Sequence, residues 1–168
     1  FVGLNEGFES CQYWMTRVVL EWECPKIQLS TSFFPGEGAT TQHDPDGKAY
    51  GIGRSSTSNL IPKNTSLGKA LIKILPSLDK KITGMSFRVP TEIVGSCSMI
   101  LEIDREIKKT EITEYLSSKE NIPIMQLSYD PIVSSDIKYH DSSCVVDMRW
   151  LEIMNNKLRL VTWYDNEW

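Results

Sequence analysis

The chain has 168 residues, of which 40% are hydrophobic and 24% charged, and its formal net charge is −4 at pH 7. This composition can bury a core and excludes an intrinsically disordered tail. The acidic balance argues against a nucleic-acid partner, because neutralising phosphates requires clustered Lys and Arg. No apolar run approaches the roughly 20 residues that a membrane span needs. We therefore expect one cytoplasmic domain with no membrane partner.

The four cysteines are widely spaced and form no CxxC pair. This spacing favours neither a zinc site nor a dense disulfide framework, so we expect reduced thiols and no metal. Cys97 and Cys144 fall in apolar strand patterns and are predicted to be core residues. Cys11 and Cys24 lie in a segment without a clear pattern, and no local spacing links either histidine to a thiol.

The first part of the chain has few clear signals. Residues 1–38 keep no clean hydrophobic period, and residues 40–59 are rich in Thr, Ser, Gly and Asp, which predicts a loop. The chain starts at Phe1 and stops inside a polar and aromatic cluster. We therefore expect it to be a piece of a larger protein.

A helix is predicted next. Leu and Ile recur over residues 67–78 at spacings of four, three and four, which is one face of a helix. Thr65 or Ser66 is the predicted N-cap. Pro76 should end the regular helix near Ile74.

The rest of the chain is predicted to be mainly strands. The strand patterns cover residues 82–89, 93–104, 122–127 and 143–148. A short amphipathic helix is predicted over residues 110–118. Residues 155 and 156, both Asn, separate two more apolar patterns and predict a hairpin, because Asn tolerates a positive φ. Strands with interspersed helices predict an α+β domain on a largely antiparallel sheet.

A few polar residues are candidates for chemistry. Arg88 ends a predicted strand, where its guanidinium could bind a phosphate or carboxylate, or could simply cap a helix or pair with an acidic residue. Thr65 could hold an anion at a helix start or act as an ordinary cap. Arg54 could add a donor from the polar loop. Asn166 could bind a planar amide or could be a turn residue.

Several strings share one order and spacing with a known family. They are Gly53-Arg54, NLIP at 59–62, TGMSFRVPT at 83–91, VSSD at 133–136 and WYDNE at 163–167. From about Ala39 to Trp168 the chain resembles the catalytic domain of phosphorylating glyceraldehyde-3-phosphate dehydrogenase. The resemblance implies a mixed, mainly antiparallel sheet backed by helices. It also implies a homotetramer and NAD as cofactor.

The resemblance carries a reaction with it. In that family a cysteine thiolate attacks the aldehyde of glyceraldehyde 3-phosphate, hydride passes to NAD, and inorganic phosphate cleaves the thioester to give 1,3-bisphosphoglycerate. By matching strings, Arg88 would bind the substrate phosphate and Thr65 the inorganic phosphate, with Ser66 beside it and Arg54 near the pocket. Asn166 would fix the nicotinamide amide.

The chain also departs from the family pattern. Cys11 is the nearest match to the nucleophile, Gly36 stands where the family has its base histidine, and Ala39 replaces a phosphate-binding Thr. No GxGxxG string is present. We therefore divide the chain into residues 1–38, a diverged remnant of the cysteine region, and residues 39–168, a catalytic domain without its NAD domain and last helix. Residues 6–38 could instead reflect a splicing or frame error.

These departures leave two functions open. One is a dehydrogenase catalytic domain with little or no activity alone, since loss of a general base typically removes roughly 10²–10⁴ in rate. The alternative is a degenerate, non-catalytic domain that acts only in binding or assembly.

Overall fold

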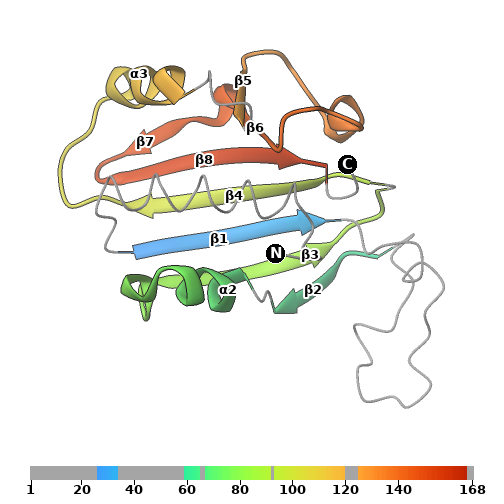
Figure 1. Ribbon diagram of the computed structural model, residues 1–168, viewed down its shortest axis with the longest axis horizontal. Helices are drawn as coiled ribbons and strands as arrows, with labels where there is room; N and C mark the ends of the chain where they lie inside the picture. Colours follow the sequence, from blue (N-terminus) through green and yellow to red (C-terminus); the bar gives the residue numbers. More distant parts are fainter. Residues whose placement is uncertain (1–25, 34–58, 65–66, 92, 120–124, 166–168) are drawn as a thin grey trace.

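A computed structural model describes residues 26–33, 59–64, 67–91, 93–119 and 125–165 of the chain. One eight-stranded sheet organises these residues, in the order β2-β3-β1-β4-β8-β6-β5 with β7 beside β8 (Figure 1). The strands are β1 (Lys26–Phe33), β2 (Ile61–Asn64), β3 (Ile82–Arg88), β4 (Gly95–Glu102), β5 (Met125–Ser128), β6 (Cys144–Asp147), β7 (Glu152–Met154) and β8 (Lys157–Tyr164).

The pairing of the strands is mixed. β1 runs parallel to β3, and β5 runs parallel to β6. The remaining neighbours, β1–β4, β2–β3, β4–β8, β6–β8 and β7–β8, are antiparallel. The predicted α+β class with a mixed, mainly antiparallel sheet is therefore confirmed.

The strongly periodic segments fold as predicted. Helix α2 (Leu67–Ile74) ends just before Pro76, which opens the 3-10 helix η1 (Pro76–Leu78). Helix α3 (Lys109–Lys119) covers the second predicted helix. β7 and β8 form the predicted hairpin, and Asn155 in its turn has a φ of 55°.

The main hydrophobic core lies on one face of the sheet. Side chains from both helices meet the inward positions of β4, β6 and β8 there, including Leu71, Leu116, Met99 and Leu160. Along β4 the buried residues alternate with half-buried or exposed ones, as the sequence pattern predicts. Burial of this apolar area is the main stabilising contribution to the fold.

Both described cysteines belong to this core. Cys97 and Cys144 are buried, and each contributes to the main cluster. The prediction that they are core residues is confirmed.

The opposite face of the sheet also carries apolar side chains. Val94, Ile137 and Val145 form a second small cluster there, against which Trp163 packs. Away from this cluster, Met85 of β3 and Ile100 of β4 remain exposed. Both lie on this opposite face, because the register places Met85 in the row of Ser98, two residues before Ile100. The register also places Ser30 and Ser98 in the row of Met85, so polar positions separate these two apolar side chains.

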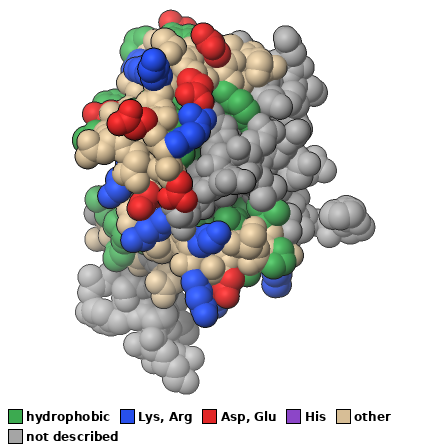
Figure 2. All heavy atoms as spheres, turned by 90° about the vertical axis from the view of Figure 1, so that its left-hand side faces the viewer, with side chains coloured by type: hydrophobic (Ala, Val, Ile, Leu, Met, Phe, Trp, Pro, Cys, Tyr) green, Lys and Arg blue, Asp and Glu red, His purple; other side chains and the backbone are tan. Residues whose placement is uncertain are grey.

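The surface on the side where β4 ends and α3 begins carries both signs of charge. Figure 2 looks onto that side, where Lys and Arg side chains are interspersed with Asp and Glu. The Arg105 guanidinium pairs with the Glu111 carboxylate there. Hydrogen bonding to Arg105 lowers the pKa of Glu111. Polyanion binding requires an extended positive field, and the described side chains on this side do not form one.

Candidate functional site

Strand ends from distant parts of the chain lie together at one end of the sheet, which we call the strand edge. β3 ends there at Arg88, β8 ends at Tyr164, and β4 begins there at Gly95 (Figure 1). The register pairs Phe33 with Arg88 and Tyr164 with Gly95. β1 and β4 lie between β3 and β8, so three strand spacings, about 14 Å, separate the Arg88 and Tyr164 backbones.

Arg88 is the sequence-predicted site residue that the structure describes. Its side chain is half-buried, and its Nε is buried without a hydrogen-bond partner. Within the described parts of the chain, no carboxylate forms an ion pair with it. A guanidinium has only donors to offer, so the partner that suits this side chain is an acceptor, best a negatively charged one.

β2 fixes where the predicted phosphate residues leave the sheet. It pairs antiparallel with β3, so Ile61 lies opposite Arg88 and Asn64 lies opposite Met85. Asn64 is thus about 10 Å from Arg88 along the strand direction. Thr65 and Ser66 follow Asn64 in the sequence and lie outside the described residues.

The other predicted site residues also lie outside the described part of the chain. They are Cys11, Gly36, Arg54 and Asn166. Their roles remain predictions from the sequence.

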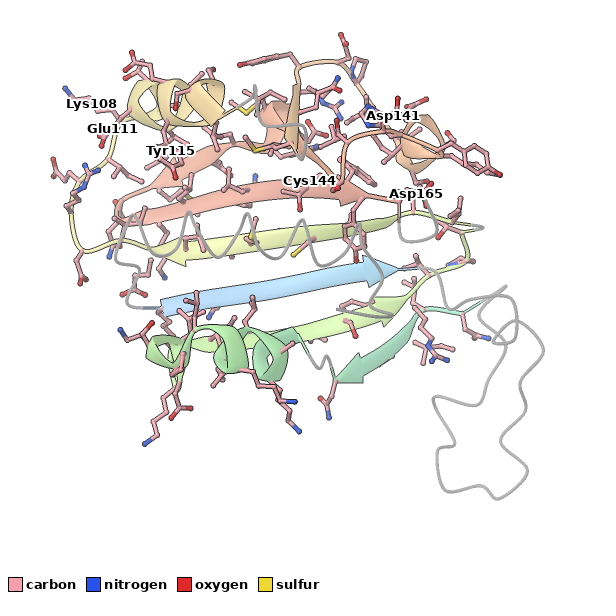
Figure 3. All side chains as sticks on the ribbon, in the orientation of Figure 1. Lys108, Glu111, Tyr115, Asp141, Cys144 and Asp165 are labelled. Atoms are coloured by element: carbon pink, nitrogen blue, oxygen red, sulfur yellow. The ribbon has the colours of Figure 1, made fainter. Side chains whose placement is uncertain are left out.

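The end of β8 is held from two sides, a feature that the sequence did not reveal. Tyr164 is buried in the main core, and Asp165 is only 4% exposed. The backbone N–H of Tyr139, a residue with a φ of 61°, donates to Oδ2 of Asp165 at 2.7 Å. Figure 3 places Asp165 at this edge of the sheet, opposite the end that carries Glu111. The chain direction just before Asn166 is therefore fixed.

A second buried carboxylate ties neighbouring elements together. Asp147 is fully buried and accepts hydrogen bonds from the Arg149 guanidinium and from the indole of Trp163. Hydrogen bonding to Asp147 raises the pKa of Arg149. Arg149 Nη2 also donates to the carbonyl oxygen of Ile132 at 3.0 Å. The segment from Ile132 to Tyr139 is thus joined to the sheet near both of its ends.

Metal and membrane sites are not found in the part of the chain described. No group of three or more His, Cys, Asp or Glu side chains there could hold a metal ion. None of the helices described has the length and apolar character needed to cross a bilayer.

Comparison with known proteins identifies the family. A family model described as glyceraldehyde 3-phosphate dehydrogenase, C-terminal domain, matches residues 37–166. The chain belongs to this family. The matched range includes Arg88, both ends of β2 and the end of β8, so the strand edge lies inside the family domain.

Individual relatives agree with the family match. A glyceraldehyde-3-phosphate dehydrogenase of Sclerotinia sclerotiorum is 35% identical over 132 residues, which is 76% of this chain and 39% of the relative. A glyceraldehyde-3-phosphate dehydrogenase 2 of Staphylococcus aureus strain Mu50 is 32% identical over 116 residues, 68% of this chain and 34% of the relative. That of Phaffia rhodozyma is 35% identical over 133 residues. The chain thus spans little more than a third of these curated relatives.

Proposed function

We propose that this chain supplies the substrate half of a phosphorylating glyceraldehyde-3-phosphate dehydrogenase. The family domain and the names of its relatives support an oxidoreductase. The observation that carries the proposal is the buried Nε of Arg88, which has no hydrogen-bond partner. Arg88 ends β3, and it is the residue to which the family resemblance assigns the substrate phosphate. Thr65, Ser66 and Arg54 complete the proposed anion pocket, and Cys11 is the proposed nucleophile.

The proposed cofactor is NAD. When bound, it would supply the hydride acceptor for oxidation of the aldehyde. The contribution of this chain is Asn166, whose amide would orient the nicotinamide carboxamide. The buried Asp165 carboxylate, held by the Tyr139 N–H, supports this role because it fixes the backbone one residue earlier.

The division of the chain and its assembly belong to the same proposal. We assign residues 39–168 to the catalytic domain and residues 1–38 to the diverged cysteine region, in a cytoplasmic homotetramer. The membership of the chain in this family supports the assembly.

The purified 168-residue chain is expected to show no phosphate-dependent formation of NADH from glyceraldehyde 3-phosphate. The sequence has no GxGxxG string to bind the dinucleotide and has Gly36 in place of the base. A spectrophotometric assay at 340 nm tests this. Measurable phosphate-dependent turnover would contradict the expectation and would show that another residue acts as the base.

Phosphate binding is expected to survive and to depend on Arg88. Replacing Arg88 with methionine removes the charge and the orphan donor but keeps an apolar stem of similar length. We expect the affinity for inorganic phosphate, measured by isothermal titration calorimetry, to fall at least about tenfold, because a hydrogen bond to a charged group contributes roughly 1.5–3 kcal/mol.

Arg105→Met is the matched control. It also removes one positive charge, but from an exposed guanidinium that is paired with Glu111. Phosphate affinity should not change at constant ionic strength. If Arg88→Met and Arg105→Met behave alike, the anion pocket is wrong, and the non-catalytic alternative, a domain active only in assembly, becomes the better description.

A further inference from the structure

Two buried polar atoms without partners lie close together in the sequence at the end of β3. They are Nε of Arg88 and Oγ1 of Thr91. Across the described ranges, Nε of Arg159 is the one other buried side-chain atom of this kind, and that guanidinium already pairs with Glu152. Leaving a buried polar group unsatisfied is costly, and each case needs an explanation. The pair at the end of β3 therefore points to a ligand.

The backbone keeps Thr91 beside the strand end. The N–H of Thr91 donates to the carbonyl oxygen of Val89 at 2.8 Å, with Pro90 between them. A hydrogen bond between residues two apart closes a three-residue turn. The chain thus folds back immediately after Arg88 instead of continuing along the direction of β3.

The chemistry of the two atoms restricts the ligand. The Nε–H of Arg88 can only donate, whereas the Thr91 hydroxyl can donate or accept. A ligand that satisfies both needs acceptor oxygens, and the guanidinium favours one that is negatively charged. A phosphate group offers several such oxygens on a single atom, so neighbouring donors can share it.

We propose that the Thr91 hydroxyl is a further ligand of the anion held by Arg88, so that this strand end binds one phosphate group through both side chains. This inference rests on the proposed function, because it adds a residue to the same pocket. It assigns a specific role to Thr91, the last residue of the string TGMSFRVPT at 83–91.

The test is Thr91→Val, which removes the hydroxyl and keeps the shape of the side chain. Inorganic phosphate and, separately, glycerol 3-phosphate are titrated into the 168-residue chain and its variants by calorimetry. We expect Thr91→Val to bind both about tenfold more weakly, as loss of one hydrogen bond to a charged group predicts. Thr91→Ser, which restores the hydroxyl, should bind as the original chain does.

Thermal unfolding separates this role from a structural one. Because the hydroxyl has no protein partner, Thr91→Val should leave the melting temperature in the absence of phosphate unchanged or higher. Thr83→Val is the matched control, since Thr83 is exposed on β3. It should change neither the phosphate affinity nor the melting temperature. A lower melting temperature for Thr91→Val would mean that the hydroxyl has a structural partner, such as a buried water, and would overturn the proposal.

The Arg88→Met variant distinguishes a failure of this inference from a failure of the proposed function. If Arg88→Met weakens phosphate binding and Thr91→Val does not, the proposed function stands and this inference is wrong. If neither substitution changes the affinity, or if the chain does not bind phosphate, both fail together.

Discussion

Replacing Gly95 with alanine is expected to lower the free energy of unfolding by about 3 kcal/mol, at the upper end of the usual cost of overpacking. Gly95 opens β4 directly opposite Tyr164 of β8. A Cβ at position 95 would lie 2.7 Å from Cε2 of the Tyr164 ring and closer still to Cζ. The ring is 2% exposed within the main core, and closely packed interiors leave no space for it to move. Urea denaturation measures the loss.

Gly68→Ala is the matched control. A Cβ at position 68 would meet Cγ2 of Ile82 at 3.7 Å, an ordinary contact. Gly68 lies in α2, where alanine is favoured over glycine by roughly 0.5–1 kcal/mol, so this variant should be as stable as the original chain or more so. In a double-mutant cycle, Gly95→Ala and Tyr164→Leu together should cost less than the sum of the two. Additive losses would show that the ring is not the cause.

The elements that could be predicted are those whose apolar period is complete within the segment. In α2, the spacing of apolar residues and Pro76 together define the helix and its end. In β4, buried Cys97, Met99 and Leu101 alternate with polar neighbours. Such patterns are local, so a single sequence contains them.

The missed strands depend on partners that are distant in the sequence. β1 lies between β3 and β4, and its Ile27 pairs with Ile82 and Leu101. Its sequence, KIQLSTSF, does alternate, but five of its eight residues are polar, and it follows a segment with no clear period. β2 has four residues including Pro62, and a proline argues against a strand unless that strand lies at an edge, as β2 does.

The candidate site was predictable in part. Arg88 could be singled out because it ends an apolar strand before a proline, and the resemblance assigned it a phosphate. That Arg88 lies in register with Tyr164 at the end of β8 follows from the order of the strands in the sheet, and no local sequence pattern encodes that order. The connection after Arg88 also contains Val94 with a φ of 79°, a conformation that is an outlier for a β-branched residue. Sequence rules therefore could not predict the path that leaves Thr91 at the strand end.

The substitution Asp147→Asn is expected to cost about 3 kcal/mol of unfolding free energy, as breaking a buried charged network typically does. Oδ1 of Asp147 accepts from the backbone N–H of Arg149 at 3.2 Å and from its Nε at 2.9 Å. Oδ2 accepts from Nη2 of Arg149 at 2.7 Å and from Nε1 of Trp163 at 3.3 Å. An amide replaces one of these oxygens with a donor. Whichever way it turns, two donors lose their acceptor in a site closed to water.

Glu152→Gln provides the comparison, because it makes the same change from carboxylate to amide in an exposed pair. Glu152 and its partner Arg159 are 45% and 40% exposed, so the cost should not exceed about 0.5 kcal/mol. The indole N–H resonance of Trp163 should shift in Asp147→Asn and stay in place in Glu152→Gln. Phosphate affinity should be kept in both, since Arg88 ends a different strand. Equal unfolding free energies for the two variants would mean that Asp147 does not hold Arg149 and Trp163 together, and that the segment before Tyr139 is anchored in another way.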